Sequence, residues 1–189
     1  MVIDDRKVNR QDYWIIKLML NVNERQTEYY ALFFDKENDK PLIFENKLLL
    51  FDENAVIKLL NETENLKRTN DLEKNIDLVY DSKKVFYLIM RRSIDMEAIL
   101  VNSINILLDL INSLLIEIPP NLKKPIFLLA DHLTFYRRYG KFLNDNQISR
   151  ESVEEFFQWI ETVIVNNSVV TSYEELSKFS LWSVFSPHH

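Results

Sequence analysis

The chain has 189 residues, of which 47% are hydrophobic and 28% charged, and its formal net charge is −6. This composition provides enough apolar side chains for a buried core and excludes a disordered or fibrous protein. The absence of cysteine and the single glycine, Gly140, argue against thiolate catalysis, sulfur ligands for zinc and glycine-rich nucleotide loops. We therefore predict no catalytic group, no cofactor and no metal site.

The first residues, MVIDDRKVNRQD, are charged and lack the apolar stretch of a signal peptide. Zero cysteines are compatible with a reducing compartment. We expect an unexported, cytoplasmic protein. The sequence leaves open whether the terminal His188 and His189 are native.

Alternation of apolar and polar residues with a period of two predicts strands in the first third of the chain. Residues 13–22 show this pattern, residues 27–35 are expected to form a second strand rich in aromatic side chains, and 41–45 and 47–51 follow after a polar turn as a third and a fourth strand. Because the connections are short, we expect an antiparallel β-meander.

A short helix with apolar residues from Ala55 to Leu60 is expected to cover the meander, and Asp52 is placed to cap its amino terminus. Residues 61–75 are polar and predict a surface loop or an exposed helix. Residues 76–81 predict one more strand.

Beyond this strand the periodicity becomes helical. We predict a long helix that begins at Ser93 or Asp95 and runs to about Glu117, where two prolines follow. A second helix is expected over 125–139, with Gly140 as its C-cap.

A period of 3.6 residues predicts a further helix from Ser149 onward. A last short helix is expected from Ser172, which forms a capping box with Glu175. The fold class is therefore α+β, in a single domain over 1–189. It is β-rich over 1–81 and helical over 84–178, with an apolar tail over 179–187.

A stripe of short polar side chains follows one face of the long helix: Asn102, Asn105, Asp109 and Asn112. Short amides suit a semi-buried position where each group finds a fixed partner. They either satisfy neighbouring backbone or line a ligand or partner groove with Asp109 as its only charge. A membrane span is not expected, because these groups are costly in lipid.

His132 lies among aromatic residues on the following helix, where a packed boundary residue is a more common role than a catalyst. With Arg137 and Arg138 it completes the candidate groove. The arginines alternate with tyrosines, a composition found in nucleic-acid patches. Basic groups at a helix carboxyl terminus also stabilise its dipole, and the protein is acidic, so we do not expect nucleic-acid binding.

Charge is divided unevenly along the helical half. Residues 118–150 carry six basic and two acidic side chains, whereas 151–189 carry six acidic side chains and one lysine. Such asymmetry creates either an interaction face or a pair of neighbouring helices that face each other. The candidate acidic face consists of Glu151, Glu154, Glu155, Glu161, Glu174 and Glu175.

The apolar tail over 179–187 must be covered, either by its own core or by a second copy in a homodimer. We expect a protein-binding module, of the inhibitor or immunity type, which uses the acidic face to meet a basic partner. The alternative is a small-ligand binder or enzyme with a pocket lined by the Asn105 and Asp109 stripe.

Overall fold

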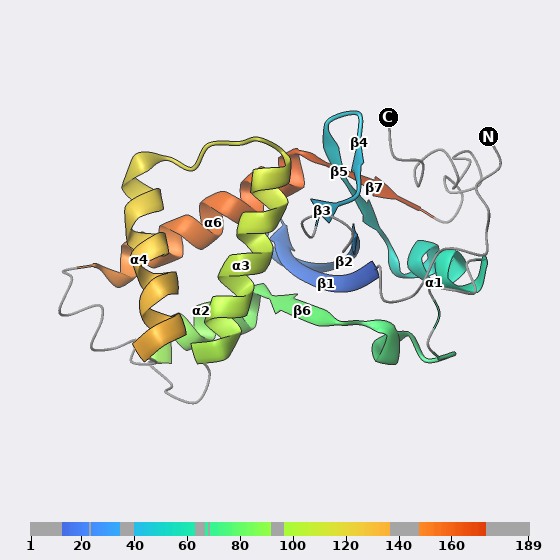
Figure 1. The fold of residues 1–189 in the computed structure, drawn as a ribbon, viewed down its shortest axis with the longest axis horizontal. Helices are drawn as coiled ribbons and strands as arrows, with labels where there is room; N and C mark the ends of the chain where they lie inside the picture. Colours follow the sequence, from blue (N-terminus) through green and yellow to red (C-terminus); the bar gives the residue numbers. More distant parts are fainter. Residues whose placement is uncertain are drawn as a thin grey trace. The chain divides into compact units, whose positions relative to one another are not determined.

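The computed structural model describes residues 13–22, 24–34, 40–62, 67, 69–91, 97–136 and 148–172. The chain divides into two compact units. The first contains Met1–Leu18, Glu28–Val79 and Asn167–His189, and the second contains Met19–Thr27 and Tyr80–Asn166. A mixed sheet formed largely by the amino-terminal strands, together with helices in the carboxyl-terminal half, confirms the α+β class (Figure 1).

The strands pair in the order β4-β5-β2-β1-β6, with β3 also on β2 and β7 also on β5. Their bounds are β1 Tyr13–Val22, β2 Arg25–Phe34, β3 Lys40–Pro41, β4 Ile43–Phe44, β5 Lys47–Phe51, β6 Leu78–Asp81 and β7 Ser168–Thr171. The simple alternation expected for β1 is incomplete. Ile15 and Ile16 are both buried although successive residues of a strand point to opposite faces, and Trp14 is exposed.

Strand β7 was not predicted. It pairs in parallel with β5, from Leu48 opposite Ser168 to Phe51 opposite Thr171 (Figure 1). The amino-terminal strands pair antiparallel as expected, β2 with β3 and β5 and β4 with β5, and the addition of β7 makes the sheet mixed. Only four residues make the strand, directly after a long helix, so the helical period of the preceding residues concealed it.

The turn between β4 and β5 is formed by Glu45 and Asn46, which both have positive φ angles, 49° and 62°. A two-residue loop with positive φ at both positions is a type I′ turn, whose twist matches that of a β-hairpin. This turn fixes the register in which Ile43 faces Leu48.

Helix α1 (Glu53–Glu62) packs its apolar face onto the sheet of the first unit. Asp52 caps it as predicted, since its Oδ1 accepts a hydrogen bond from the Ala55 amide at 2.7 Å. The core of this unit joins residues from both elements: Tyr13, Ile15, Tyr30, Leu32, Leu42, Leu49, Phe51, Ala55, Val56, Leu59 and Leu60.

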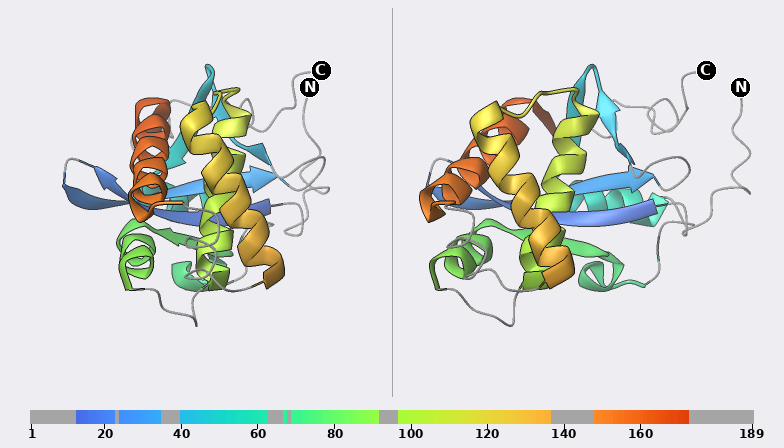
Figure 2. Two further views of the ribbon diagram at one scale, coloured as in Figure 1. Left: turned by 90° about the vertical axis from the view of Figure 1, so that its left-hand side faces the viewer. Right: turned by 60° about the vertical axis from the view of Figure 1, so that its left-hand side comes forward.

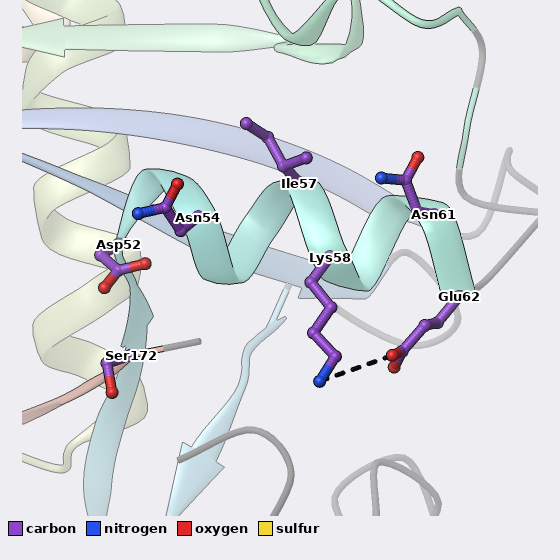
Figure 3. Close-up of a pocket in the computed structure, with 7 residues that line it drawn as sticks. All are labelled: Asp52, Asn54, Ile57, Lys58, Asn61, Glu62 and Ser172. Carbon is purple, nitrogen blue, oxygen red and sulfur yellow. Dashed lines mark ion pairs between the residues drawn. The ribbon is translucent and has the colours of Figure 1, made fainter. Parts of the chain in front are cut away.

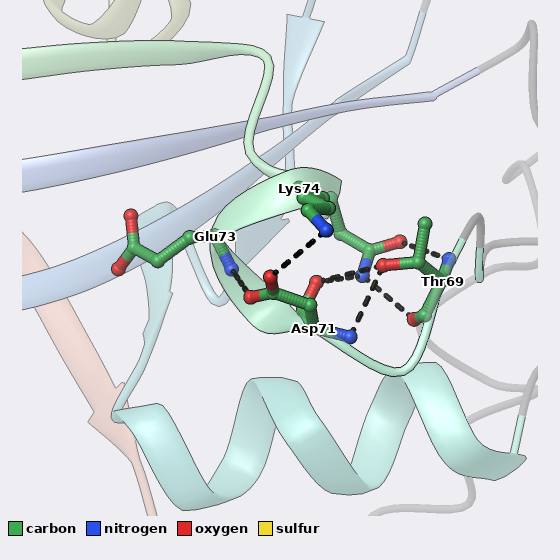
Figure 4. A network of polar contacts seen from close by, with 5 residues as sticks. Thr69, Asp71, Glu73 and Lys74 are labelled. Carbon is green, nitrogen blue, oxygen red and sulfur yellow. Dashed lines mark hydrogen bonds and ion pairs between the residues drawn. The ribbon is translucent and has the colours of Figure 1, made fainter.

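Part of the polar segment that follows α1 folds into a compact loop around the 3-10 helix η4 (Leu72–Asn75) (Figure 4). The buried Asn75 amide donates to the carbonyls of Thr69 and Asp71 at 2.9 and 2.7 Å. The Asp71 side chain caps η4 through the Glu73 amide. Among the described residues of 61–75, Asn75 is the buried one and the others are exposed or half-buried, in agreement with the prediction of a surface segment.

In the described part of the second unit, four helices make up most of the structure: α2 (Ser82–Arg91), α3 (Glu97–Ser113), α4 (Pro120–Tyr136) and α6 (Arg150–Asn166). Figure 2 shows α3 and α4 side by side, and both helices also contact α6. Helix α4 begins at Pro120, so Pro125 lies inside it and not in its first turn as expected.

Helix α3 ends at Ser113, before the predicted Glu117. Its end is a Schellman motif, in which Ile116 donates to the Ile111 carbonyl and Leu115 donates to the Asn112 carbonyl. Leu115 occupies the left-handed position of this motif with a φ of 57°, where glycine is usual.

Several predicted features lie outside the described residues. They are the helix caps Ser93, Asp95 and Gly140, the short helix after Ser172 and the apolar tail over 179–187.

Candidate interaction surfaces

The polar stripe of α3 lies on the surface of the protein. Asn102, Asn105, Asp109 and Asn112 are all exposed, so the expectation that they are semi-buried is wrong. The buried side of the helix is apolar and contains Ile104, Leu107, Leu110 and Ile111 among others. The stripe therefore lies on the exposed face of α3.

The other members of the candidate groove belong to helix α4 and the residues after it. Helix α4 packs against α3, and His132 is half-buried on it. Arg137 and Arg138 lie outside the described residues. The described part of this set therefore combines one half-buried imidazole with an exposed polar stripe.

The candidate acidic face is smaller than expected. Glu151 and Glu155 are exposed at the start of α6 and Glu154 is half-buried, while Glu174 and Glu175 lie outside the described residues. Hydrogen bonding to its own backbone amide and to the Ser149 hydroxyl holds the pKa of Glu151 below its usual range. Glu151 lies in the first turn of α6, where a carboxylate stabilises the helix dipole.

Glu161 does not belong to this face, because it is buried with only 3% of its surface exposed. Its Oε1 accepts a hydrogen bond from the Tyr80 hydroxyl on β6. Its Oε2 accepts from the Ser82 hydroxyl at the start of α2 and from the Asn21 amide on β1, both at 3.1 Å. We call these four residues the Glu161 cluster.

Burial raises the pKa of Glu161, although the hydrogen bonds from Tyr80, Asn21 and Ser82 act in the opposite direction. Burial also raises the pKa of Tyr80, and the adjacent Glu161 carboxylate adds to this effect. The phenol therefore stays neutral and acts as a donor. The sequence did not predict this cluster, because Glu161 is a single charged residue within the regular helical pattern of α6.

Helix α4 exposes three large apolar side chains on its outer face. Phe127 is 42% exposed, Leu128 39% and Phe135 75%. Residues seven or eight apart on a helix lie on the same side, two turns from each other. The opposite side of α4 is anchored by buried residues: Leu122, Ile126, Leu129 and Leu133.

A pocket of about 670 Å³ lies beside α1 and is open to solvent. Its described lining is Asp52, Asn54, Ile57, Lys58, Asn61, Glu62 and Ser172 (Figure 3). Lys58 forms an ion pair with Glu62 at 3.6 Å across one turn of the helix. None of the predicted site residues belongs to this described lining, so the pocket is not the ligand site expected from the α3 stripe.

Within the described ranges, no helix is long and apolar enough to cross a membrane, and no group of histidine and carboxylate side chains is arranged to hold a metal ion. Comparisons with protein-family models, curated proteins and solved structures give no match. The class defined by the fold is thus α+β, and the surfaces of the chain itself must support any proposal of function.

Proposed function

We propose that the chain is a protein-binding module that contacts its partner through the outer face of α4. The observation that supports this proposal is the exposure of Phe127, Leu128 and Phe135 on one side of one helix. Proteins in water rarely leave such groups clustered on the surface without a role, and aromatic side chains provide much of the energy of protein interfaces.

The anchoring of α4 strengthens the proposal. A surface helix normally presents polar residues opposite its buried stripe. Here Ile126, Leu129 and Leu133 already supply a buried stripe, and the three exposed apolar groups are additional to it. The helix does not need them for its own packing.

The expected partner is an amphipathic segment of another protein that carries acidic groups around its apolar face. Lys123 and Lys124 are exposed one turn before Phe127. Arg137, Arg138 and Lys141 follow Phe135 in the sequence. Basic groups that flank an apolar centre favour a partner of complementary charge and increase its rate of association.

A second version of the proposal uses the acidic start of α6 to meet a basic partner. The exposure of Glu151 and Glu155, one turn apart, favours it. Without Glu161 this face has fewer charges than the sequence suggested. The small-ligand alternative loses its main premise, since Asp109 is exposed on α3.

A photo-crosslinking side chain at position 128 tests the α4 proposal in lysate of the source cell. We expect the cross-linked peptide of the partner to be acidic and amphipathic. Its yield should fall at least about tenfold in the double variant Phe127→Ser and Phe135→Ser, which corresponds to about 1.4 kcal/mol of binding energy. It should also fall in Lys123→Glu with Lys124→Glu.

The matched control is the pair Tyr87→Ser and Met90→Ser, because α2 exposes these two apolar residues to a similar extent, 50% and 58%. Capture at position 128 should persist in this control. Cross-linking of a second copy alone, or equal loss in the control, would reject the α4 proposal. Loss of capture in Glu151→Lys with Glu155→Lys, and in no α4 variant, would select the acidic version.

A further inference from the structure

We propose that the exposed face of α4 is self-complementary, and that two copies of the chain pair through it, antiparallel, in a weak and reversible homodimer. This inference rests on the function proposed above, because the homodimer covers the same face that the partner contacts. It adds regulation to that function: self-association competes with partner binding, so access to the face depends on the concentration of the protein itself.

Six exposed residues form one line along α4, opposite its buried stripe. They are Pro120, Lys124, Phe127, Leu128, Asp131 and Phe135. We call this line the α4 seam. Successive turns of the helix contribute members three or four residues apart, which keeps them on one side of the helix. The same spacing marks the line along which two helices pack in a coiled coil. The α4 seam is therefore suited to a second helix that lies along it.

Opposite charges are placed symmetrically in the α4 seam. Lys124 precedes Phe127 by three residues, and Asp131 follows Leu128 by three residues. In a two-fold symmetric interface, a residue i that contacts residue j of the second copy is matched by the reverse contact. An antiparallel pair centred between Phe127 and Leu128 therefore places Lys124 opposite Asp131 of the second copy, and does so twice.

Apolar side chains occupy the other positions of this pairing. Phe127 and Leu128 of both copies meet at the two-fold axis, and Phe135 lies opposite Pro120 of the second copy at each end. Phe127 is 42% exposed, Leu128 39% and Phe135 75%. Pairing removes this apolar surface from water, which is the favourable term in most protein association.

The charges also select one register of the pair. A parallel arrangement places Lys124 opposite Lys124 and Asp131 opposite Asp131, and an antiparallel arrangement centred on Asp131 brings two carboxylates together. Like charges that face each other across an interface are strongly unfavourable. The register centred between Phe127 and Leu128 avoids both conflicts and satisfies Lys124 and Asp131 together.

The size of the seam predicts weak association. An interface made by one helix from each copy is smaller than the roughly 1,600 Å² of total buried surface in a standard stable complex. Exposed ion pairs add little affinity and mainly fix the orientation of the pair. The homodimer should therefore form at high protein concentration and dissociate when a partner binds α4 with higher affinity.

Sedimentation velocity of the purified full-length protein, over a range of concentrations, tests the proposal. We expect a monomer–dimer equilibrium. The single variants Lys124→Asp and Asp131→Lys should each weaken it at least about tenfold, because each places like charges opposite each other. The double variant should recover most of the association, since it restores both ion pairs in reversed order. An equal mixture of the two single variants should form a mixed dimer for the same reason.

The matched control is Lys83→Asp, which makes the same change of charge at an exposed site on α2 and should leave self-association unaltered. A protein that is monomeric at every concentration would overturn the homodimer and leave the binding function intact, because cross-linking in lysate judges that function separately. Self-association that persists in both single variants would also overturn it, since the contact would then lie elsewhere in the chain. A homodimer rescued by the double variant, with no other cross-linked protein, would support this inference and reject the proposed function.

Discussion

Tyr80 and Glu161 are 81 residues apart in sequence, yet the Tyr80 hydroxyl donates a hydrogen bond to the Glu161 carboxylate in the interior of the second unit. The contact connects strand β6 to helix α6. Since both side chains are buried, neither can replace the lost partner with water without a rearrangement. Conservative substitutions at Tyr80 should therefore have measurable effects on the free energy of unfolding and on the pKa of Glu161.

Replacement Tyr80→Phe removes the donor and keeps the ring. We expect the free energy of unfolding to fall by about 1–3 kcal/mol, because a buried carboxylate loses a hydrogen bond. The Tyr80 bond lowers the pKa of Glu161, so its loss should raise the titration midpoint further above 4.5. Urea unfolding and carboxyl carbon NMR titration measure the two effects. The control Tyr87→Phe, at a 50% exposed site, should change both far less.

Leu115 is suited to a substitution that improves stability. It has a φ of 57° and is 91% exposed, so its side chain contributes almost no packing. Leu115→Gly should be more stable than Leu115→Ala by about 1 kcal/mol, since alanine keeps the steric penalty of the left-handed region. Thermal or urea unfolding of the two variants provides the comparison. Equal stability would mean that this residue is not constrained to a positive φ in solution.

Thr171 is fully buried on β7, and its hydroxyl has no hydrogen-bond partner among the residues described. Thr171→Val should leave the free energy of unfolding unchanged or raise it by up to about 1 kcal/mol, because an unsatisfied buried polar atom is removed. Thr171→Ser keeps the hydroxyl and loses the methyl group, so it should be destabilising. A loss of more than about 1 kcal/mol in the valine variant would show that the hydroxyl is satisfied.

The two sides of α4 should respond differently to truncation. Phe135→Ser should alter the free energy of unfolding by no more than about 0.5 kcal/mol, because the ring is 75% exposed. Leu133→Ala, at a buried position on the same helix, should cost about 2–5 kcal/mol. Urea unfolding distinguishes the two. A large loss in Phe135→Ser would indicate that the ring is needed for folding and would weaken its assignment to a binding surface.

Local patterns in the sequence predicted much of the fold. The strand at 13–22, the helix capped by Asp52 and the helix that begins near Ser149 all occur close to their expected positions. These predictions succeeded because side-chain periodicity and capping depend on neighbours within about four residues. Strand β7 was missed because its partner β5 is distant in the sequence.

The surfaces required knowledge of the tertiary structure. Sequence reasoning recognised that Asn102, Asn105, Asp109 and Asn112 share a face, but it could not tell that this face is the exposed one. The same reasoning treated Glu161 as one more surface charge. Its burial depends on Tyr80, Ser82 and Asn21, which approach it from three other elements.

The sequence by itself thus determined the α+β class, most of the elements and the groups available for chemistry, since these follow from composition and short-range periodicity. Only the tertiary structure decided which apolar groups of α4 remain exposed and which carboxylate is buried. Exposure and burial depend on the packing of elements that are far apart in the chain, and long-range packing leaves no periodic signal in any one of them.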